Sequence, residues 1–382
     1  MVQASRRLIL AAVFASSLGV GLIFGFQPPL IALVLARSGS SSFAIGAITA
    51  SSLVAVICFG PFYPRIISRL GLRRCIVLGM SVAAIILLLM PLWPGVPMWL
   101  CLRFIAGLAL GLTWIASEIW MNNVSDSKSR GTVMGLYGTV FSIGTIAGPV
   151  LLEFTGTDGA RPFVIGALVL TLTLLPLVIL RRVVSEPQAF APLRGLATGL
   201  RAAPIVMGAA LVAGLVESAD LTLLPLYGVR AGLGERAALL LLTVFIAGNV
   251  ILQLPVGLLA DRYGRHRLLG FCALISGLGP LLLQSSLGTP LLLWPLLFLW
   301  GGTLYAFYSQ GVALLGEEFA AAQQPAANTL FVMVYCFGGV LGPSVGGIAM
   351  DLWPRQGLPV LVSSAALMLL LGLVIGRFSS SR

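Results

Sequence analysis

The chain has 382 residues, of which 58% are hydrophobic and only 9% are charged. An ordinary water-soluble domain carries roughly 25% charged residues, so this composition excludes a soluble enzyme or soluble binding domain. The formal net charge of +11 indicates membrane topology and attraction to anionic lipid rather than binding to nucleic acid, because the basic residues gather in short polar breaks.

Apolar runs of about 17 to 25 residues alternate with these polar breaks, and each run could cross a bilayer core about 30 Å thick as one helix. Runs of this length and continuity exclude the short strands of a membrane barrel. The sequence therefore predicts an all-α membrane protein with twelve spans, at residues 8–35, 43–64, 75–92, 98–121, 131–153, 163–180, 203–227, 237–260, 268–285, 291–314, 329–350 and 360–376.

The distribution of basic residues predicts the orientation of these spans. With both termini in the cytoplasm, most Arg residues fall on the cytoplasmic side, and the residues left outside are Arg37, Arg161, Arg230, Arg236 and Arg355. Because positive residues are retained on the cytoplasmic face, we expect an integral protein of a bacterial inner membrane with cytoplasmic termini.

Two patterns recur about half a chain apart. RLGLRRCIVLG at 69–79 returns as RYGRHRLLG at 262–270, and Gly144-x-x-x-Gly148-Pro149 returns as Gly338-x-x-x-Gly342-Pro343. Internal duplication is the usual construction of secondary transporters. We therefore expect two six-helix bundles, at residues 1–180 and 203–382, joined by a cytoplasmic linker at 181–202 that is rich in Arg, Pro and Gly.

The loop between the eighth and ninth spans has a dense charged motif, GLLADRYGRHR, at 257–267. Gly257 is expected to let helices approach closely, and Asp261 to reach the start of the fifth span near residues 130–133, where helix amides are unpaired. Arg262, Gly264 and Arg265 complete the motif, and Arg265 is expected to approach Glu317 or Glu318. The first-half copy has Pro64, Ser68 and Leu72 in place of the glycine, the aspartate and an arginine, so any cytoplasmic latch there is weaker or built differently.

This motif resembles the cytoplasmic-loop signature of the major facilitator superfamily. Arg103-x-x-x-Gly107 in the fourth span resembles the superfamily's membrane-embedded arginine motif, and Gly148-Pro149 resembles a glycine-proline motif frequent in its exporters, although the trailing Gly-Gly pair occurs only in the eleventh span. The stretch RFIAGLALGLTWIASEIWMNN at 103–123, followed by SRGTVMGLYG, is similar to the YcaD-like group of bacterial members. The resemblance implies the two-bundle fold of that superfamily and transport by alternating access.

Charged groups within the spans are costly, by at least about 2.5 to 3.5 kcal/mol each, and usually face a cavity. Arg103, Glu217 and Asp220 lie at similar predicted depths. The first, fourth, seventh and tenth helices line the cavity in the resembling fold, which implies that these groups face one another. Glu217 and Asp220 share a helix face, so they could hold and release a proton. The alternative is that they hydrogen-bond neighbouring helices or cap a helix break near Pro225.

Other polar residues in the spans are weaker candidates. Glu118 lies on the same face as Arg103 and could gate or relay protons near the cytoplasmic end. Equal alternatives are an interfacial anchor or a bond to a neighbouring helix. The cavity-lining candidates, for each of which ordinary helix packing is an equal alternative, are Gln27, Trp114, Tyr305, Tyr308 and Gln310.

No catalytic or metal-binding constellation is present in the sequence, so we expect neither enzymatic activity nor a cofactor or metal. The expected partners are a small-molecule substrate, protons and the lipid bilayer, with no nucleic acid, and the chain is expected to be monomeric. The predicted function is secondary, proton-coupled transport, with efflux favoured over uptake. The competing class is a lipid flippase or a non-transporting sensor on the same fold.

Overall fold

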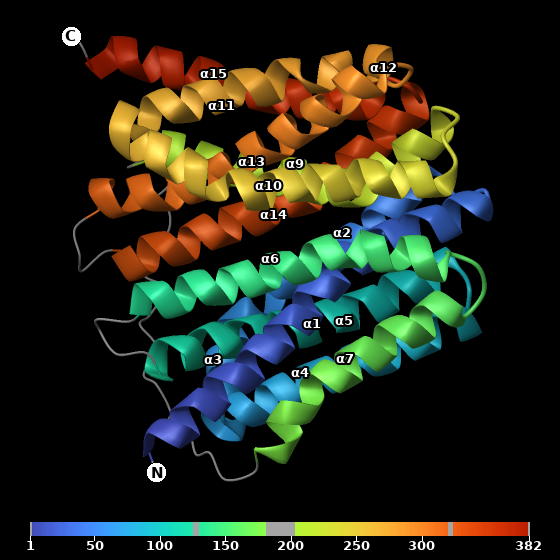
Figure 1. Cartoon of the computed structure of the whole chain (residues 1–382), viewed down its shortest axis with the longest axis vertical. Coiled ribbons are helices and arrows are strands. Elements are labelled where there is room, and N and C mark those ends of the chain that lie inside the picture. Colours follow the sequence, from blue (N-terminus) through green and yellow to red (C-terminus); the bar gives the residue numbers. More distant parts are fainter. Residues whose placement is uncertain (1, 125–129, 181–202, 320–323, 381–382) are drawn as a thin grey trace. The chain divides into compact units, whose positions relative to one another are not determined.

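The computed structural model describes residues 2–124, 130–180, 203–319 and 324–380 (Figure 1), and these residues form helices without any strand. Twelve helical stretches among them are long and apolar enough to cross a membrane, which confirms the predicted spans. Their bounds are Leu8–Arg37, Ser42–Leu70, Leu72–Leu92, Val96–Met121, Val133–Thr155, Arg161–Ile179, Pro204–Arg230, Glu235–Tyr263, Arg265–Ser286, Pro290–Glu318, Ala327–Leu352 and Gly357–Ile375. The predicted linker at 181–202 lies outside the described residues.

The first half contains seven α-helices and two short 3₁₀ turns within its described residues. The 3₁₀ turn at Pro61 interrupts the second span and the one at Pro91 ends the third, since proline lacks the amide that would continue an α-helix. The elements are α1 (Val2–Arg37), α2 (Ser42–Phe59), η1 (Gly60–Phe62), α3 (Tyr63–Leu70), α4 (Leu72–Leu89), η2 (Met90–Leu92), α5 (Val96–Val124), α6 (Arg130–Thr155) and α7 (Arg161–Ile179).

The second half repeats the six spans, although its second span, α10, is one continuous helix. Its third span is interrupted at a proline, Pro280, which begins a 3₁₀ turn. The elements are α9 (Pro204–Arg230), α10 (Glu235–Tyr263), α11 (Arg265–Leu278), η3 (Pro280–Leu282), α12 (Leu283–Ser286), α13 (Pro290–Glu318), α14 (Gln324–Leu352) and α15 (Gly357–Ser380).

The two repeated loop motifs make the same turn. Gly71 joins α3 to α4 with φ 79° and ψ 154°, and Gly264 joins α10 to α11 with φ 90° and ψ 135°. Residues with a side chain rarely adopt this conformation, so both turns require glycine. Equivalent backbone geometry at equivalent positions supports the internal duplication.

The described residues form two compact units. Residues up to 34 and from 51 to 180 belong to the first, and residues 35–50 together with 203–380 belong to the second. The same helix pairs are in close contact in each unit. A Cβ on Gly144 of α6 would overlap the Leu18 carbonyl of α1, and a Cβ on Gly338 of α14 would overlap the Leu211 carbonyl of α9. The structure therefore has the repeated bundles of the expected fold class.

Candidate functional site

The glycine-proline motif of α14 brings its backbone directly against α9. Cβ atoms on Gly338 and Gly342 would overlap the carbonyls of Leu211 and Leu215, and a Cβ on Gly214 of α9 would overlap the carbonyl of Tyr335. Small residues permit this approach between membrane helices. As a result, side chains of α14 lie within reach of the acidic residues of α9.

The motif copy in the first unit has the same role. Gly148 lies against the backbone of Gly25 and Phe26, with a built Cβ only 2.5 Å from the Phe26 nitrogen, and Pro149 follows it within α6. Pro343 follows Gly342 in α14 in the same way. Both copies of the motif therefore lie where two helix backbones come close together.

Glu217 and Asp220 have different surroundings although they are three residues apart. The Tyr335 hydroxyl donates a hydrogen bond of 2.6 Å to Glu217 Oε2. Asp220 is fully buried, and neither of its carboxyl oxygens has a hydrogen-bond partner among the described residues. The two acids are close enough to interact electrostatically. The described part of the chain gives neither acid an ion pair.

Aromatic rings surround the hydroxyl that binds Glu217. Tyr308 of α13 meets Tyr335 edge-on with ring centroids 5.2 Å apart, and it meets Phe331 at 5.3 Å. Edge-to-face rings at these distances fix one another's orientation. Tyr308, predicted as a cavity-lining candidate, thus supports the Tyr335–Glu217 hydrogen bond through packing. The side chain of Tyr305 lies outside the described residues.

Arg103 occupies a buried polar cluster in the first unit. Its side chain donates from Nη1 to Gln27 Oε1 of α1 and from Nη2 to Ser52 Oγ of α2, the latter over 2.9 Å. Gly107, one turn further along α5, lets the backbone of Ser52 come close. Among the described residues of this unit, Arg103 has no carboxylate partner. Gln27, predicted to line the transport path, is instead buried beside this guanidinium.

Trp114 and Glu118 are also brought together on α5, as their spacing on one helix face predicts. The Trp114 Nε1 atom donates a 2.7 Å hydrogen bond to Glu118 Oε1, and Tyr137 of α6 lies close enough to interact electrostatically with Glu118. Glu118 is half-buried. Arg103 and the Glu217–Asp220 pair belong to different units, so their expected proximity stays a prediction.

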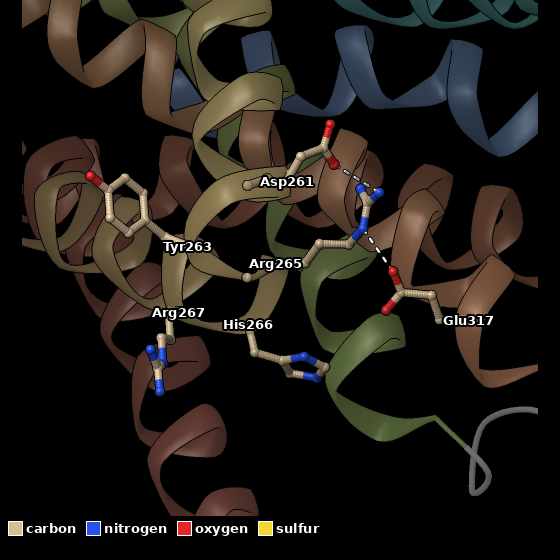
Figure 2. A pocket seen from close by; sticks show the side chains of 8 residues that line it. Asp261, Tyr263, Arg265, His266, Arg267 and Glu317 are labelled. Atoms are coloured by element: carbon tan, nitrogen blue, oxygen red, sulfur yellow. Dashed lines mark hydrogen bonds and ion pairs between the residues drawn. The ribbon is translucent and has the colours of Figure 1, made fainter.

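The loop motif at 257–267 forms a charged cluster that lines an open pocket (Figure 2). Arg265 donates from Nε to Glu317 Oε1 over 2.8 Å and pairs with Asp261 Oδ1 over 3.1 Å. It also donates to the buried Gln310 over 3.3 Å, which places this cavity-lining candidate with the loop motif. The labelled side chains of His266 and Arg267 point away from this cluster.

The loop motif makes one of its two expected contacts within the second unit. The predicted approach of Arg265 to Glu317 is confirmed, but the pair forms within one unit, so it does not depend on closure of the two halves. Asp261 has a 67% exposed side chain. Its expected contact with the helix amides near residues 130–133 stays a prediction, because the two segments belong to different units.

Gly257 departs from its expected role. A Cβ at this position would meet no described atom within 4 Å. The close helix approach predicted at Gly257 is therefore wrong for the part of the chain that the structure describes, since space remains there for a side chain.

Sequence reasoning missed Tyr335 and Ser52. The signal for Tyr335 was available, because it precedes Gly338 by three residues and hence shares the motif face of α14. Ser52 had no comparable signal, since a serine in an apolar helix commonly bonds its own backbone.

A twelve-span helical fold with duplicated halves, buried acids and a buried arginine defines a multi-span membrane transporter. The family model described as Major Facilitator Superfamily matches residues 9–242 and 232–380, and the chain belongs to that superfamily.

Proteins similar to this chain agree with that assignment. An uncharacterized MFS-type transporter of Bacillus subtilis, YfkF, is 23% identical over 92% of this chain and 91% of its own length. The MFS-type transporter YcaD of Shigella flexneri is 26% identical over 90% of both chains. The crystal structure of the nucleoside transporter NupG is similar with a TM-score of 0.80 at 17% identity, covering 96% of this chain and 98% of that one.

Proposed function

We propose that the chain is a secondary active carrier that moves a small molecule by alternating access, coupled to protons through Glu217 and Asp220. The observation that carries this proposal is the burial of Asp220 without a hydrogen-bond partner among the described residues, three positions from an acid that has one. Burying an unpaired carboxylate costs several kcal/mol. A proton taken up by this pair on one side and released on the other couples the two movements.

Tyr335 has a defined part in this proposal. Its hydroxyl donates to Glu217, and a charge-assisted hydrogen bond of this kind holds a carboxylate more strongly than a neutral acid. Asp220 lacks such a donor. The pair therefore consists of one acid whose charged form is stabilised and one whose charged form is not, and this asymmetry favours a single shared proton.

Arg103 is proposed as a fixed cation of the transport pathway. Its partners within its unit are the neutral side chains of Gln27 and Ser52. These neutral partners bind two of the guanidinium nitrogens, while Nε has no hydrogen-bond partner among the described residues. They leave the charge uncompensated, so it can attract an anionic group. The group it serves is either an anionic part of the substrate or a carboxylate of the carrier itself.

Export is the proposed direction of transport, supported by the Gly148-Pro149 motif in α6.

The proposed location is a bacterial inner membrane, with both termini in the cytoplasm. The positions of the basic residues support this orientation. A monomer is proposed as the working unit because one chain supplies both bundles. Reporter fusions at the two termini test the orientation: activity of both in the periplasm would overturn it.

The substrate has first to be found by binding. We would screen the purified protein for ligand-induced thermal stabilisation against metabolites and drugs, since a ligand that binds the folded state raises its apparent stability. NupG is a nucleoside transporter by its name, so nucleosides are sensible first probes. The likeness concerns the fold alone.

The coupling test follows with the solute so identified. In proteoliposomes with an imposed proton gradient, Glu217→Gln should abolish pH-driven accumulation and retain solute exchange. Glu153→Gln, at the outer end of α6, is the matched control and should accumulate normally. Accumulation by Glu217→Gln at the wild-type level would refute the proposal, and movement of labelled lipid in place of solute would favour a flippase.

A further inference from the structure

The beginning of α2 is tied to the end of α14 by a carboxylate. Asp351, in the last turn of α14, accepts hydrogen bonds from the backbone amides of Ser42 (2.9 Å) and Phe43 (3.0 Å), the first two residues of α2. Amides in the first turn of a helix have no partner within the helix, and the helix dipole favours an anion there. Asp351 therefore supplies the N-terminal cap of a helix 308 residues away in sequence.

The two helices also touch backbone to backbone at this point. A Cβ on Gly347 of α14 would lie 2.6 Å from the Ser42 carbonyl carbon and 2.8 Å from the Phe43 Cα. A Cβ on Gly46 of α2 would overlap the Pro343 carbonyl. Glycine on each helix thus permits the approach that brings the amides to the carboxylate.

Two basic residues flank this contact. Arg230, the last residue of α9, lies 3.7 Å from Asp351 Oδ1 and donates to the Met350 carbonyl over 3.3 Å. Arg37, the last residue of α1, pairs with Glu235, the first residue of α10. The contacts of Asp351 with Ser42, Phe43 and Arg230, together with the Arg37–Glu235 pair, are called the outer clasp below.

The outer clasp joins residues that chain connectivity assigns to different halves. Residues 35–50 pack with the second unit, whereas the rest of α1 and α2 belongs to the first. Both helices are continuous across these boundaries. A movement that carried the whole of α1 and α2 with the first half would have to pull Ser42 and Phe43 off Asp351.

At the other end of the second span, the sequence has no carboxylate at the position that matches Asp261. Ser68 in α3 stands where the second-half motif has Asp261, and its hydroxyl donates to the Arg65 carbonyl within its own helix. The carboxylate between the second and eleventh spans is therefore at the end predicted to face outward. We propose that the outer clasp is a gate lock that stabilises the outward-closed state and must break for the outer mouth to open.

This inference rests on the proposed alternating access, and its test uses neither substrate nor a proton gradient. Spin labels on Pro94→Cys and Gly288→Cys, in a background without the five native cysteines, report the distance across the predicted outer mouth in the purified full chain. Both positions are exposed and follow the third span of their half. Asp351→Asn and Asp351→Ala should raise the ratio of long to short distances roughly tenfold, because charge-assisted bonds are lost.

Asp158→Asn, an exposed acid of the loop between α6 and α7, is the matched control and should leave the distances unchanged. Arg37→Glu should also favour the long distance, and adding Glu235→Arg should restore the short one. This charge exchange keeps the idea testable if the Asp351 variants fold poorly. Unchanged distances in folded Asp351 variants, or in Arg37→Glu, would overturn the clasp.

The failure of the proposed function looks different. If the Asp351 variants change the label distances but solute flux does not depend on the proton gradient, proton coupling is refuted and the outer clasp is supported. If solute flux is coupled to the proton gradient but the label distances are unchanged in the Asp351 variants, the outer clasp is refuted and the proposed function is supported.

Discussion

Tyr335 of α14 and Glu217 of α9 are joined by a 2.6 Å hydrogen bond, although 118 residues separate them in the chain. The bond exists because Gly214 lies directly under the Tyr335 carbonyl, so the two helix axes approach more closely than side chains would allow. Helix packing and the chemistry of the acidic pair are therefore linked, because the close α9–α14 contact also places the Tyr335 hydroxyl within hydrogen-bond distance of Glu217.

Removing this hydroxyl should weaken coupling. Tyr335→Phe deletes the donor to Glu217 while keeping the ring against Tyr308, and we expect about tenfold fewer protons to accompany each solute, with binding of the solute retained. The measurement is solute flux together with vesicle acidification. Tyr227→Phe is the control, because its buried hydroxyl has no hydrogen-bond partner among the described residues. Equal coupling in Tyr335→Phe and wild type would show that the bond is only structural.

The α9–α14 contact should not tolerate even one added methyl group. Gly342→Ala places a Cβ against the Leu215 carbonyl and 2.9 Å from its carbon, and overpacking of this kind costs about 1 to 3 kcal/mol. Gly372→Ala in α15, where a Cβ meets no described atom within 4 Å, is the control. Thermal unfolding in detergent should show a clearly lower melting temperature for Gly342→Ala and not for Gly372→Ala. A wild-type melting temperature for Gly342→Ala would contradict the packing role.

The sequence predicts the spans and the duplication because both depend on local properties. Apolar length defines each helix, and Gly71 and Gly264 mark the same turn in each half. Buried charge likewise singles out Arg103, Glu217 and Asp220, since such groups are rare in a span. These features need no knowledge of which helix faces which.

Partners across helices were not predictable in this way. The bonds from Arg103 to Gln27 and Ser52, and from Ser42 to Asp351, depend on the rotation and offset of helices far apart in the chain. Hydropathy does not encode those quantities. Asp351 lies at the end of a span, where an acid commonly faces water, so nothing in its local sequence marked it as a helix cap.

The two terminal nitrogens of the Arg103 guanidinium, and not only its charge, should be required for stability and transport. Arg103→Lys keeps a cation but offers one nitrogen where Gln27 and Ser52 are bound by two, so we expect a loss of about 1 to 3 kcal/mol in unfolding free energy and a defect in transport. Arg161→Lys, exposed at the start of α7, is the control. Thermal unfolding and flux report the two effects separately. A fully stable and active Arg103→Lys would mean that charge alone suffices.

The two loop glycines should respond alike to substitution if the halves are true repeats. Gly71→Ala and Gly264→Ala each force a Cβ into a backbone conformation with φ of 79° and 90°, which costs about 1 to 3 kcal/mol. At Gly264 a Cβ meets no described atom within 4 Å. Any loss of stability in Gly264→Ala therefore reports backbone strain and not steric overlap. Gly257→Ala provides the matched control, since it is helical, equally open and only seven residues away; it should be neutral or slightly stabilising. Thermal unfolding of the three variants distinguishes the two explanations. A loss of stability in Gly257→Ala equal to that in Gly264→Ala would indicate that the loop motif needs small residues for a contact. A loss of stability confined to Gly71→Ala and Gly264→Ala would show that both glycines are required by the turn.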